Sequence, residues 1–406
     1  MTAGLINGLV VAVVATGAAI LLFLPGYMRS DGWRATVTPL ASIIGSGFLI
    51  LGPLLTRTYG HMAVGVMALL CIVAFGFGSA IRFNILELDR RGAAELPGPI
   101  AALDATASWA LAFAYIVSVA YYLRLFGSFA VSLTSVEDAF HAKLVTTAVL
   151  AFVGLYGYAR GLRALEGLER VSVGVKLAII AGLLAGLALY AVELASAGTL
   201  PTNGTPPITW GSLTVGLGLL VTVQGFETSR YLGAAYDARM RVRTMRRAQY
   251  IASAIYVVYI LLVALAFPAE KVDVSETAII KIAAVVAPIL PALLIAAALA
   301  SQFSAAVADT SGGGGLAEEL SRAGLPSRVA YLLIAIVAIA LVWAADVFQI
   351  IAFASRAFAV YYALQSTLAA CLAWRRPGGR RPGLAAFHGA FALFALVIAV
   401  FGAPVE

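Results

Sequence analysis

Apolar runs close to 20 residues long follow one another along the whole chain, and short polar segments separate them. A helix needs about 20 residues to cross the hydrocarbon core of a bilayer, whereas a transmembrane barrel shows alternating segments of about 10 residues. The pattern therefore predicts an all-α polytopic membrane protein. Twelve spans are expected, at residues 4–24, 38–56, 62–86, 108–133, 143–159, 171–195, 209–233, 248–267, 279–308, 328–345, 347–373 and 383–402.

The composition points to lipid as the solvent for most of the surface. Of the 406 residues, 62% are hydrophobic and 12% are charged, whereas a soluble domain carries about 25% charged residues. The lipid bilayer is thus an expected partner. The first run, 4–24, could also be a signal peptide, but no Lys or Arg precedes it, so we expect it to remain as a span.

Basic residues alternate between the two sides of the predicted spans. The loops on one side hold 18 Lys and Arg residues, and those on the other side hold 3. Because basic residues accumulate on the inner side of a membrane, both termini are predicted to be external. The Ala- and Arg-rich composition suggests the inner (plasma) membrane of a bacterium. The loop "DARMRVRTMRR", residues 237–247, could instead bind nucleic acid or lipid headgroups, but topology explains the charge of +7, and no nucleic acid is expected.

Two spans carry residues that weaken a helix at its centre. The second contains Gly45, Ser46 and Gly47 within "ASIIGSGFLI", which alone could be a kink or a packing face. The seventh contains "VQGFETS", residues 223–229, with Glu227 at the depth of the hydrocarbon core. An ionisable residue at that depth is costly and suggests a functional site.

The two weakened spans are five apart, so they cross the membrane in opposite directions. This relation predicts an inverted repeat of five helices and five helices, with a site between the two broken ones. The predicted repeats are residues 31–200 and 201–376. Accessory helices, one at each end, are expected within 1–30 and 377–406.

A broken membrane helix frees backbone groups that must meet a cavity or a ligand. The N-terminal end of a half-helix attracts a carboxylate, and its C-terminal end attracts an ammonium group or a cation. Such a site holds a small polar solute rather than transforming it. The histidines and the two cysteines lie far apart in the sequence, so no enzyme activity, cofactor or metal is expected.

The two segments resemble a known family. "IIGSGFLILGPLL" (43–55) is similar to the first core helix of the amino acid–polyamine–organocation (APC) superfamily, and "VQGFETSRYLGAAYDARMRVRTMRRA" (223–248) is similar to its sixth. The resemblance implies a LeuT-type fold and secondary active transport of an amino acid or related small organic solute by alternating access. A major-facilitator transporter and a non-transporting sensor on the same fold are the alternatives.

The resemblance also implies a substrate site. Gly45, Ser46 and Gly47 would meet the substrate carboxylate, and residues 224–228 would line the opposite side. Glu227 could take part in gating or proton handling, or could only support the break. The expected substrate-binding residues are Ile44, Gly45, Ser46, Gly47, Tyr121, Val223, Gln224, Gly225, Phe226, Glu227, Thr228, Ser301 and Ser304.

Three further expectations concern single positions, and the first two of them follow from the resemblance. Lys176, in "RVSVGVKLAII", would occupy the place of sodium in sodium-coupled relatives, which implies proton coupling or exchange; its alternative is a side chain that reaches the inner surface. Val223 stands where many amino-acid transporters have an aromatic residue, which suggests another substrate. Gly312–Gly315 are expected to end a helix at the inner surface.

Overall fold

The structure is a computed structural model, and it describes residues 2–45, 47–91, 97–136, 138–162, 168–232, 236–272, 275, 277–322, 324–375 and 380–403. Within these ranges every regular element is a helix. The helices are α1 (Thr2–Leu22), α2 (Pro25–Met28), α3 (Asp31–Ile43), α4 (Gly47–Tyr59), α5 (Ala63–Arg91), α6 (Gly98–Val131), α7 (Ala139–Arg160), α9 (Leu168–Ser196), α10 (Trp210–Gly218), α11 (Ala238–Ala266), α12 (Ala278–Val286), α13 (Leu290–Leu320), α14 (Ser327–Ala344), α15 (Val347–Trp374) and α16 (Pro382–Phe401). Short 3-10 turns are η1 (Gly60–Met62), η3 (Leu219–Val223), η4 (Phe226–Tyr231) and η5 (Ala269–Lys271).

Ten described helical segments are long and apolar enough to cross a membrane, and one of them joins α4 to α5. The broken segments α3–α4 and α10–η3–η4 contain pieces that are too short to be counted alone. When each broken segment is taken as one crossing, the described helices make the twelve crossings expected from the sequence. The prediction of an all-α polytopic membrane protein is therefore confirmed.

The ninth predicted span was wrong at its start. Residues 279–308 belong to two helices, α12 and α13, and α13 continues to Leu320. Between them Ala287 is extended, with φ −157° and ψ 138°, because the residue before a proline, here Pro288, avoids the helical region. Pro291 then stands in the first turn of α13, where a missing N–H costs nothing.

The expectation that Gly312–Gly315 end a helix was also wrong, since all four lie inside α13. Gly314 packs directly against the ring of Tyr331, where a Cβ atom would collide with it. Gly314 therefore allows close helix packing instead of stopping the helix.

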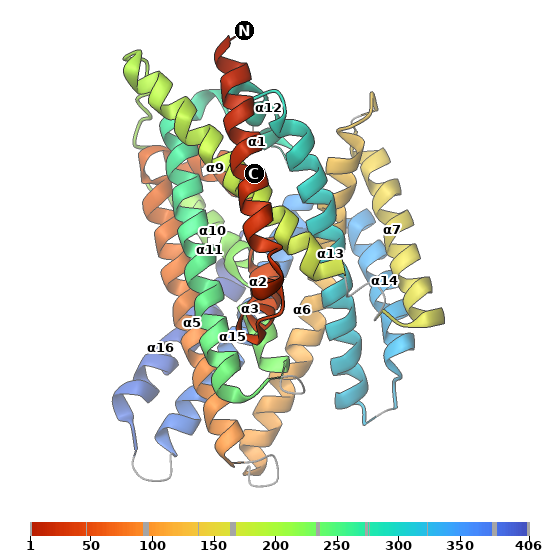
Figure 1. Cartoon of the computed structure of the whole chain (residues 1–406). Coiled ribbons are helices and arrows are strands. Elements are labelled where there is room, and N and C mark those ends of the chain that lie inside the picture. Colours follow the sequence, from red (N-terminus) through yellow and green to blue (C-terminus); the bar gives the residue numbers. More distant parts are fainter. Residues whose placement is uncertain are drawn as a thin grey trace.

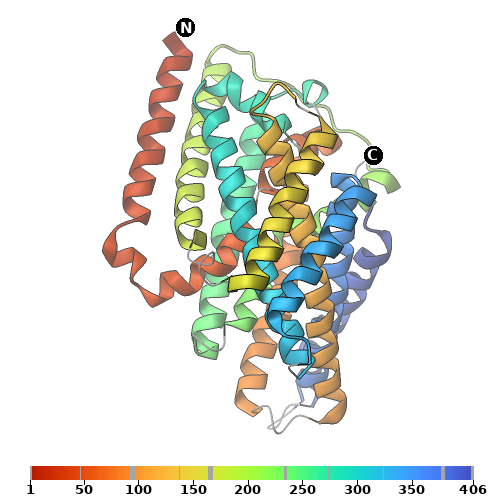
Figure 2. The same cartoon turned by 90° about the vertical axis from the view of Figure 1, so that its right-hand side faces the viewer.

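The helix α6 lies in the middle of the bundle, in contact with α7, α13, α14 and α15. The first and last helices are peripheral, since α1 packs mainly on α9, and α16 mainly on α15. Figure 2 shows α1 as a separate rod along one margin of the bundle. In Figure 1 the C-terminal ends of α5 and α15 and the N-terminal ends of α6 and α16 lie at the lower end of the bundle, opposite the N-terminus of the chain.

Candidate functional site

The first break separates α3 from α4. The helix α3 ends at Ile43, and Ile44 leaves the helical region with φ −84° and ψ 69°. The helix α4 begins at Gly47. Ser46, the central residue of the predicted motif, lies outside the described residues. Around this gap the last carbonyl groups of α3 and the first N–H groups of α4 have no partners within their own helices.

The second break separates η3 from η4. Gln224 is extended, and Gly225 has φ 114°, a value that favours glycine. Gly225 also lies against the backbone of the first break: a Cβ atom there would come within 2.5 Å of the Ser42 carbonyl carbon and 2.6 Å of the Ile43 nitrogen. The two breaks predicted from the sequence therefore touch each other through their main chains.

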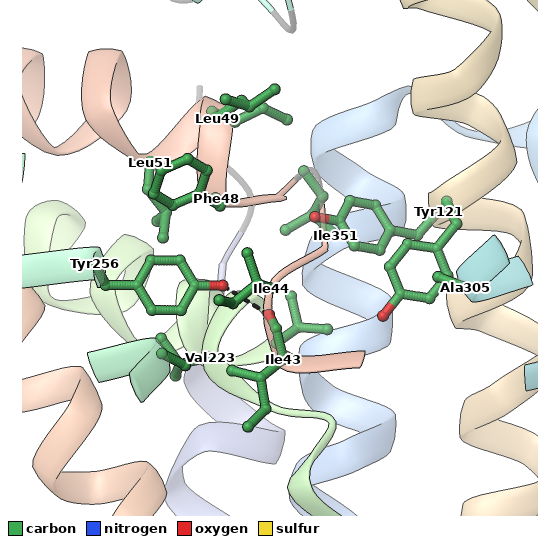
Figure 3. Close-up of a cluster of buried hydrophobic side chains, with 14 of the residues drawn as sticks. Ile43, Ile44, Phe48, Leu49, Leu51, Tyr121, Val223, Tyr256, Ala305 and Ile351 are labelled. Atoms are coloured by element: carbon green, nitrogen blue, oxygen red, sulfur yellow. Dashed lines mark hydrogen bonds between the residues drawn. The ribbon is translucent and has the colours of Figure 1, made fainter. Parts of the chain in front are cut away.

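A tyrosine from α11 joins the two breaks. The Tyr256 hydroxyl lies 2.7 Å from the Ile43 carbonyl oxygen and 2.7 Å from the Thr222 carbonyl oxygen. Figure 3 shows the contact with Ile43, with Val223 beside the Tyr256 ring. The sequence analysis missed Tyr256, because a single tyrosine in an apolar span gives no sign of what it faces.

Lys176 reaches the C-terminal end of α3. Its ammonium group donates to the carbonyl oxygens of Ala41, at 3.0 Å, and Ile44, and to the Ser301 hydroxyl, at 3.1 Å. The residue is 5% exposed, so the alternative of a side chain that reaches the surface does not hold. A positive charge at a helix C-terminus interacts favourably with the helix dipole. Lys176 thus links α9, the first break and α13.

Glu227 is fully buried and turned toward its own break. Its carboxylate accepts hydrogen bonds from the Gly225 N–H, at 3.0 Å, and the Tyr362 hydroxyl, at 2.9 Å. The Tyr362 hydroxyl also lies 3.4 Å from the Gln224 side-chain oxygen. The Phe226 ring stacks on the Tyr362 ring, with centroids 5.4 Å apart. These contacts hold the left-handed conformation of Gly225.

Tyr121 and Tyr122 of α6 face the first break. A Cβ atom on Gly47 would collide with the Tyr121 hydroxyl, and one on Gly45 would come within 3.2 Å of the Tyr122 ring. The Tyr121 hydroxyl is buried, and within the described part of the chain it has no hydrogen-bond partner. Figure 3 shows its ring directed toward the break, near Ile351.

A cavity of about 270 Å³ opens beside the two breaks, between α3, η4, α6 and α13. Of the predicted residues, Thr228 and Ser304 line it, while Gly45 and Ser301 line a smaller space next to Lys176. Side chains not predicted also line the cavity: Thr38, Ser42, Tyr115, Tyr231, Asp309 and Ser311. Asp309 could have been found, because an acid within an apolar span is itself a signal.

A polytopic helical bundle with two broken helices meeting beside a small cavity is typical of membrane transporters. The comparisons with known proteins lead to the same class. A family model described as "APC superfamily transporter" matches residues 25–402, and the chain belongs to the APC superfamily of transporters. An uncharacterized protein of Aquifex aeolicus (strain VF5) is 42% identical over 358 residues, which cover 86% of each chain. The family confirms the resemblance seen in the sequence and replaces the major-facilitator alternative.

Proposed function

We propose that the protein is a secondary active transporter that moves a small organic solute by alternating access, with the solute bound between the two breaks. The contact between Gly225 and the Ser42–Ile43 backbone carries this proposal. It brings together two chain segments whose backbone groups are freed from helical hydrogen bonds, and such groups are tolerated in a membrane only beside a cavity or a ligand.

The start of α4 is the proposed position for a carboxylate of the solute. The first N–H groups of a helix form an anion site, and the absence of a Cβ atom at Gly47 lets the Tyr121 hydroxyl lie directly against the start of this helix. The buried Tyr121 hydroxyl, at Gly47, would add a donor from α6. Ser46 is assigned to this carboxylate position only by the family resemblance.

Lys176 is proposed to couple transport to protons. Its ammonium group holds the end of α3 against α13 by three hydrogen bonds. Loss of a proton from Lys176 would remove the charge and one of these donors, and would therefore loosen α3. Glu227, bound to Tyr362, is a second proposed participant.

The function is tested with the full chain in proteoliposomes. We expect uptake of a labelled solute to follow an imposed pH gradient and to be independent of sodium. Candidate solutes are first selected by thermal stabilisation of the purified protein, because a ligand stabilises the state that binds it.

The variant Gly45→Leu should abolish uptake because Leu fills the space beside Tyr122. The matched control is Gly65→Leu, at an exposed glycine of α5 with no atom within 4 Å of the added Cβ. Normal uptake in Gly45→Leu would contradict the site. Binding of a solute without flux under any gradient would favour the sensor alternative.

A further inference from the structure

The first helix packs on the bundle through one narrow face. Gly4, Asn7, Val11 and Ala15 recur at the three- and four-residue spacing of one helix face, and each lies against α9, α12 or the turn after α12. Most other residues of α1 are half-buried or exposed. The helix α1 ends before residue 25, where the match to the transporter family begins, so the family does not account for this face.

Three glycines of α9 make room for the first helix. A Cβ atom on Gly182 would lie 3.0 Å from the Val11 carbonyl oxygen, and one on Gly186 would lie 2.8 Å from the Val11 side chain. A Cβ atom on Gly174 would lie 2.7 Å from the ring of Phe23, the residue after α1. Val11 is fully buried. Small residues of this kind let two membrane helices approach closely, and here they bring α1 directly onto α9.

A buried asparagine of α1 joins the ends of two other helices. Asn7 is 2% exposed, and its side-chain amide donates to the Val286 carbonyl oxygen, at 3.3 Å, and to the Glu193 carboxylate, at 3.4 Å. Val286 is the last residue of α12, so its carbonyl group has no acceptor role within that helix. Glu193 lies in the last turn of α9. Asn7 thus ties the end of α12 to the end of α9.

The helix α12 covers the α4 side of the breaks. It contacts α4, α13, α9 and α1, and its buried residues include Ile279, Ile282 and Ala283. It has only 9 residues, and the extended Ala287 separates it from α13. A short helix next to an extended residue can turn as a unit about that residue. Any opening on the α4 side must therefore displace α12.

The other end of α1 leads toward the first break. After Phe23 the chain passes through α2 and enters α3 at Asp31, and α3 ends at Ile43 beside the break. Figure 2 shows α1 along the margin of the bundle, followed by the turn into these helices. One continuous segment therefore connects α12, which packs on α4, with α3.

We propose that α1 is a strap, formed by its face from Gly4 to Ala15, that holds α12 against α9 and so keeps the α4 side of the breaks closed. The glycines of α9 seat the strap, and Asn7 fastens it to α12. The proposal rests on the proposed function in one respect, because the opening that the strap resists is a step of alternating access.

Hydrogen exchange in the purified full chain measures the opening of α12 without any solute. Asn7→Leu removes both hydrogen bonds, and each bond between membrane helices changes an equilibrium by about 2.8-fold. The amides of α12 should therefore exchange about 8-fold faster in this variant. The matched control is Thr16→Val, which makes an exposed polar position of α1 apolar and should leave the exchange of α12 unchanged.

Gly182→Leu tests the strap from the α9 side. The atoms nearest to an added Cβ belong to Val11 and Ala15 of α1, so the larger side chain lifts α1 from its seat. Exchange of α12 should again be faster, and the double variant with Asn7→Leu should exceed the larger single effect by less than twofold, because both changes release one strap. Gly17→Leu is the control, since nothing lies within 4 Å of an added Cβ there.

Exchange of α14 separates a local strap from general destabilisation, because α14 packs mainly on α6, α7 and α13. Unchanged exchange of α12 in both Asn7→Leu and Gly182→Leu would overturn the strap. An equal acceleration in α14, or fully multiplicative effects in the double variant, would overturn it as well.

Transport separates this proposal from the function on which it rests. Faster exchange confined to the helices that α1 contacts, without flux of any solute in proteoliposomes, would support the strap and overturn the transport proposal. Flux of a solute by the unchanged chain, with unchanged exchange of α12 in both variants, would overturn the strap and leave the transporter in place.

Discussion

Replacing Gly225 by alanine is expected to push the two breaks apart. Gly225 has φ 114°, and its added methyl group would lie 2.5 Å from the Ser42 carbonyl carbon, where ordinary contacts begin at 3.4 Å. The backbone at Ser42 would have to retreat by about 0.9 Å, the difference between these two distances. A backbone atom cannot turn away as a flexible side chain can, so the strain must move α3 or η4.

The magnitude follows from two separate costs. A residue with a Cβ in the left-handed region costs about 1–2 kcal/mol, and forcing a methyl group into a packed site costs about 1–3 kcal/mol. Gly225→Ala should therefore destabilise by about 2–5 kcal/mol. At about 2 °C for each kcal/mol, the melting temperature should fall by about 4–10 °C.

Gly198→Ala separates the two costs. Gly198 has φ 67°, and nothing lies within 4 Å of an added Cβ, so this variant carries only the backbone strain of about 1–2 kcal/mol. The assay is thermal unfolding of both purified variants at one heating rate, together with solute binding. Equal decreases in melting temperature, with solute binding kept in Gly225→Ala, would refute the contact between the breaks.

Three other changes test the parts around this contact. Tyr256→Phe leaves the Ile43 and Thr222 carbonyls without their shared donor and should cost about 1–2 kcal/mol in thermal unfolding; an unchanged melting temperature would contradict this. Lys176→Met should remove the pH dependence of uptake, whereas Lys143→Met, on α7, should not; a pH profile that survives Lys176→Met would refute the coupling role. Glu227→Gln keeps an acceptor for Tyr362 but loses the charge, so initial uptake should fall about 10-fold; wild-type uptake would leave Glu227 only a supporting role.

The sequence predicted those features that depend on residues close together along the chain. Apolar runs mark the crossings, and the break after Ile43 and the left-handed Gly225 are marked by glycines inside such runs. Pro288 and Pro291 also marked the end of α12, but the uniform apolarity of 279–308 concealed it. Gly314 was misread because the sequence alone does not distinguish a glycine that lets the Tyr331 ring pack against the helix from a glycine that ends the helix.

The contacts across helices could not be predicted from the sequence alone. Tyr256 stands in an ordinary apolar span, and its importance comes from the Ile43 carbonyl, which is far away in the sequence. Asp309 is an acid that the sequence does reveal, but its contact with Ser118 of α6 depends on how the helices pack. Lys176 was singled out through the family resemblance, but its bond to Ser301 depends on how α9 and α13 pack. Periodicity indicates which face of a helix is buried and not which residue of another helix meets it.

The packing differs on the two sides of the breaks, and this difference bears on alternating access. On the α4 side, the ring of Phe48 packs against those of Tyr259, at 4.2 Å, and Tyr256, at 5.5 Å, and all three residues are buried. On the α3 side lies the cavity. The structure is thus closely packed on the α4 side of the breaks and hollow on the α3 side. The proposed opposite state requires Phe48 to separate from Tyr259 while the cavity beside α3 and α13 closes. Because Lys176 bonds the end of α3 to Ser301 of α13, the coupling role proposed for Lys176 would act where that closure takes place.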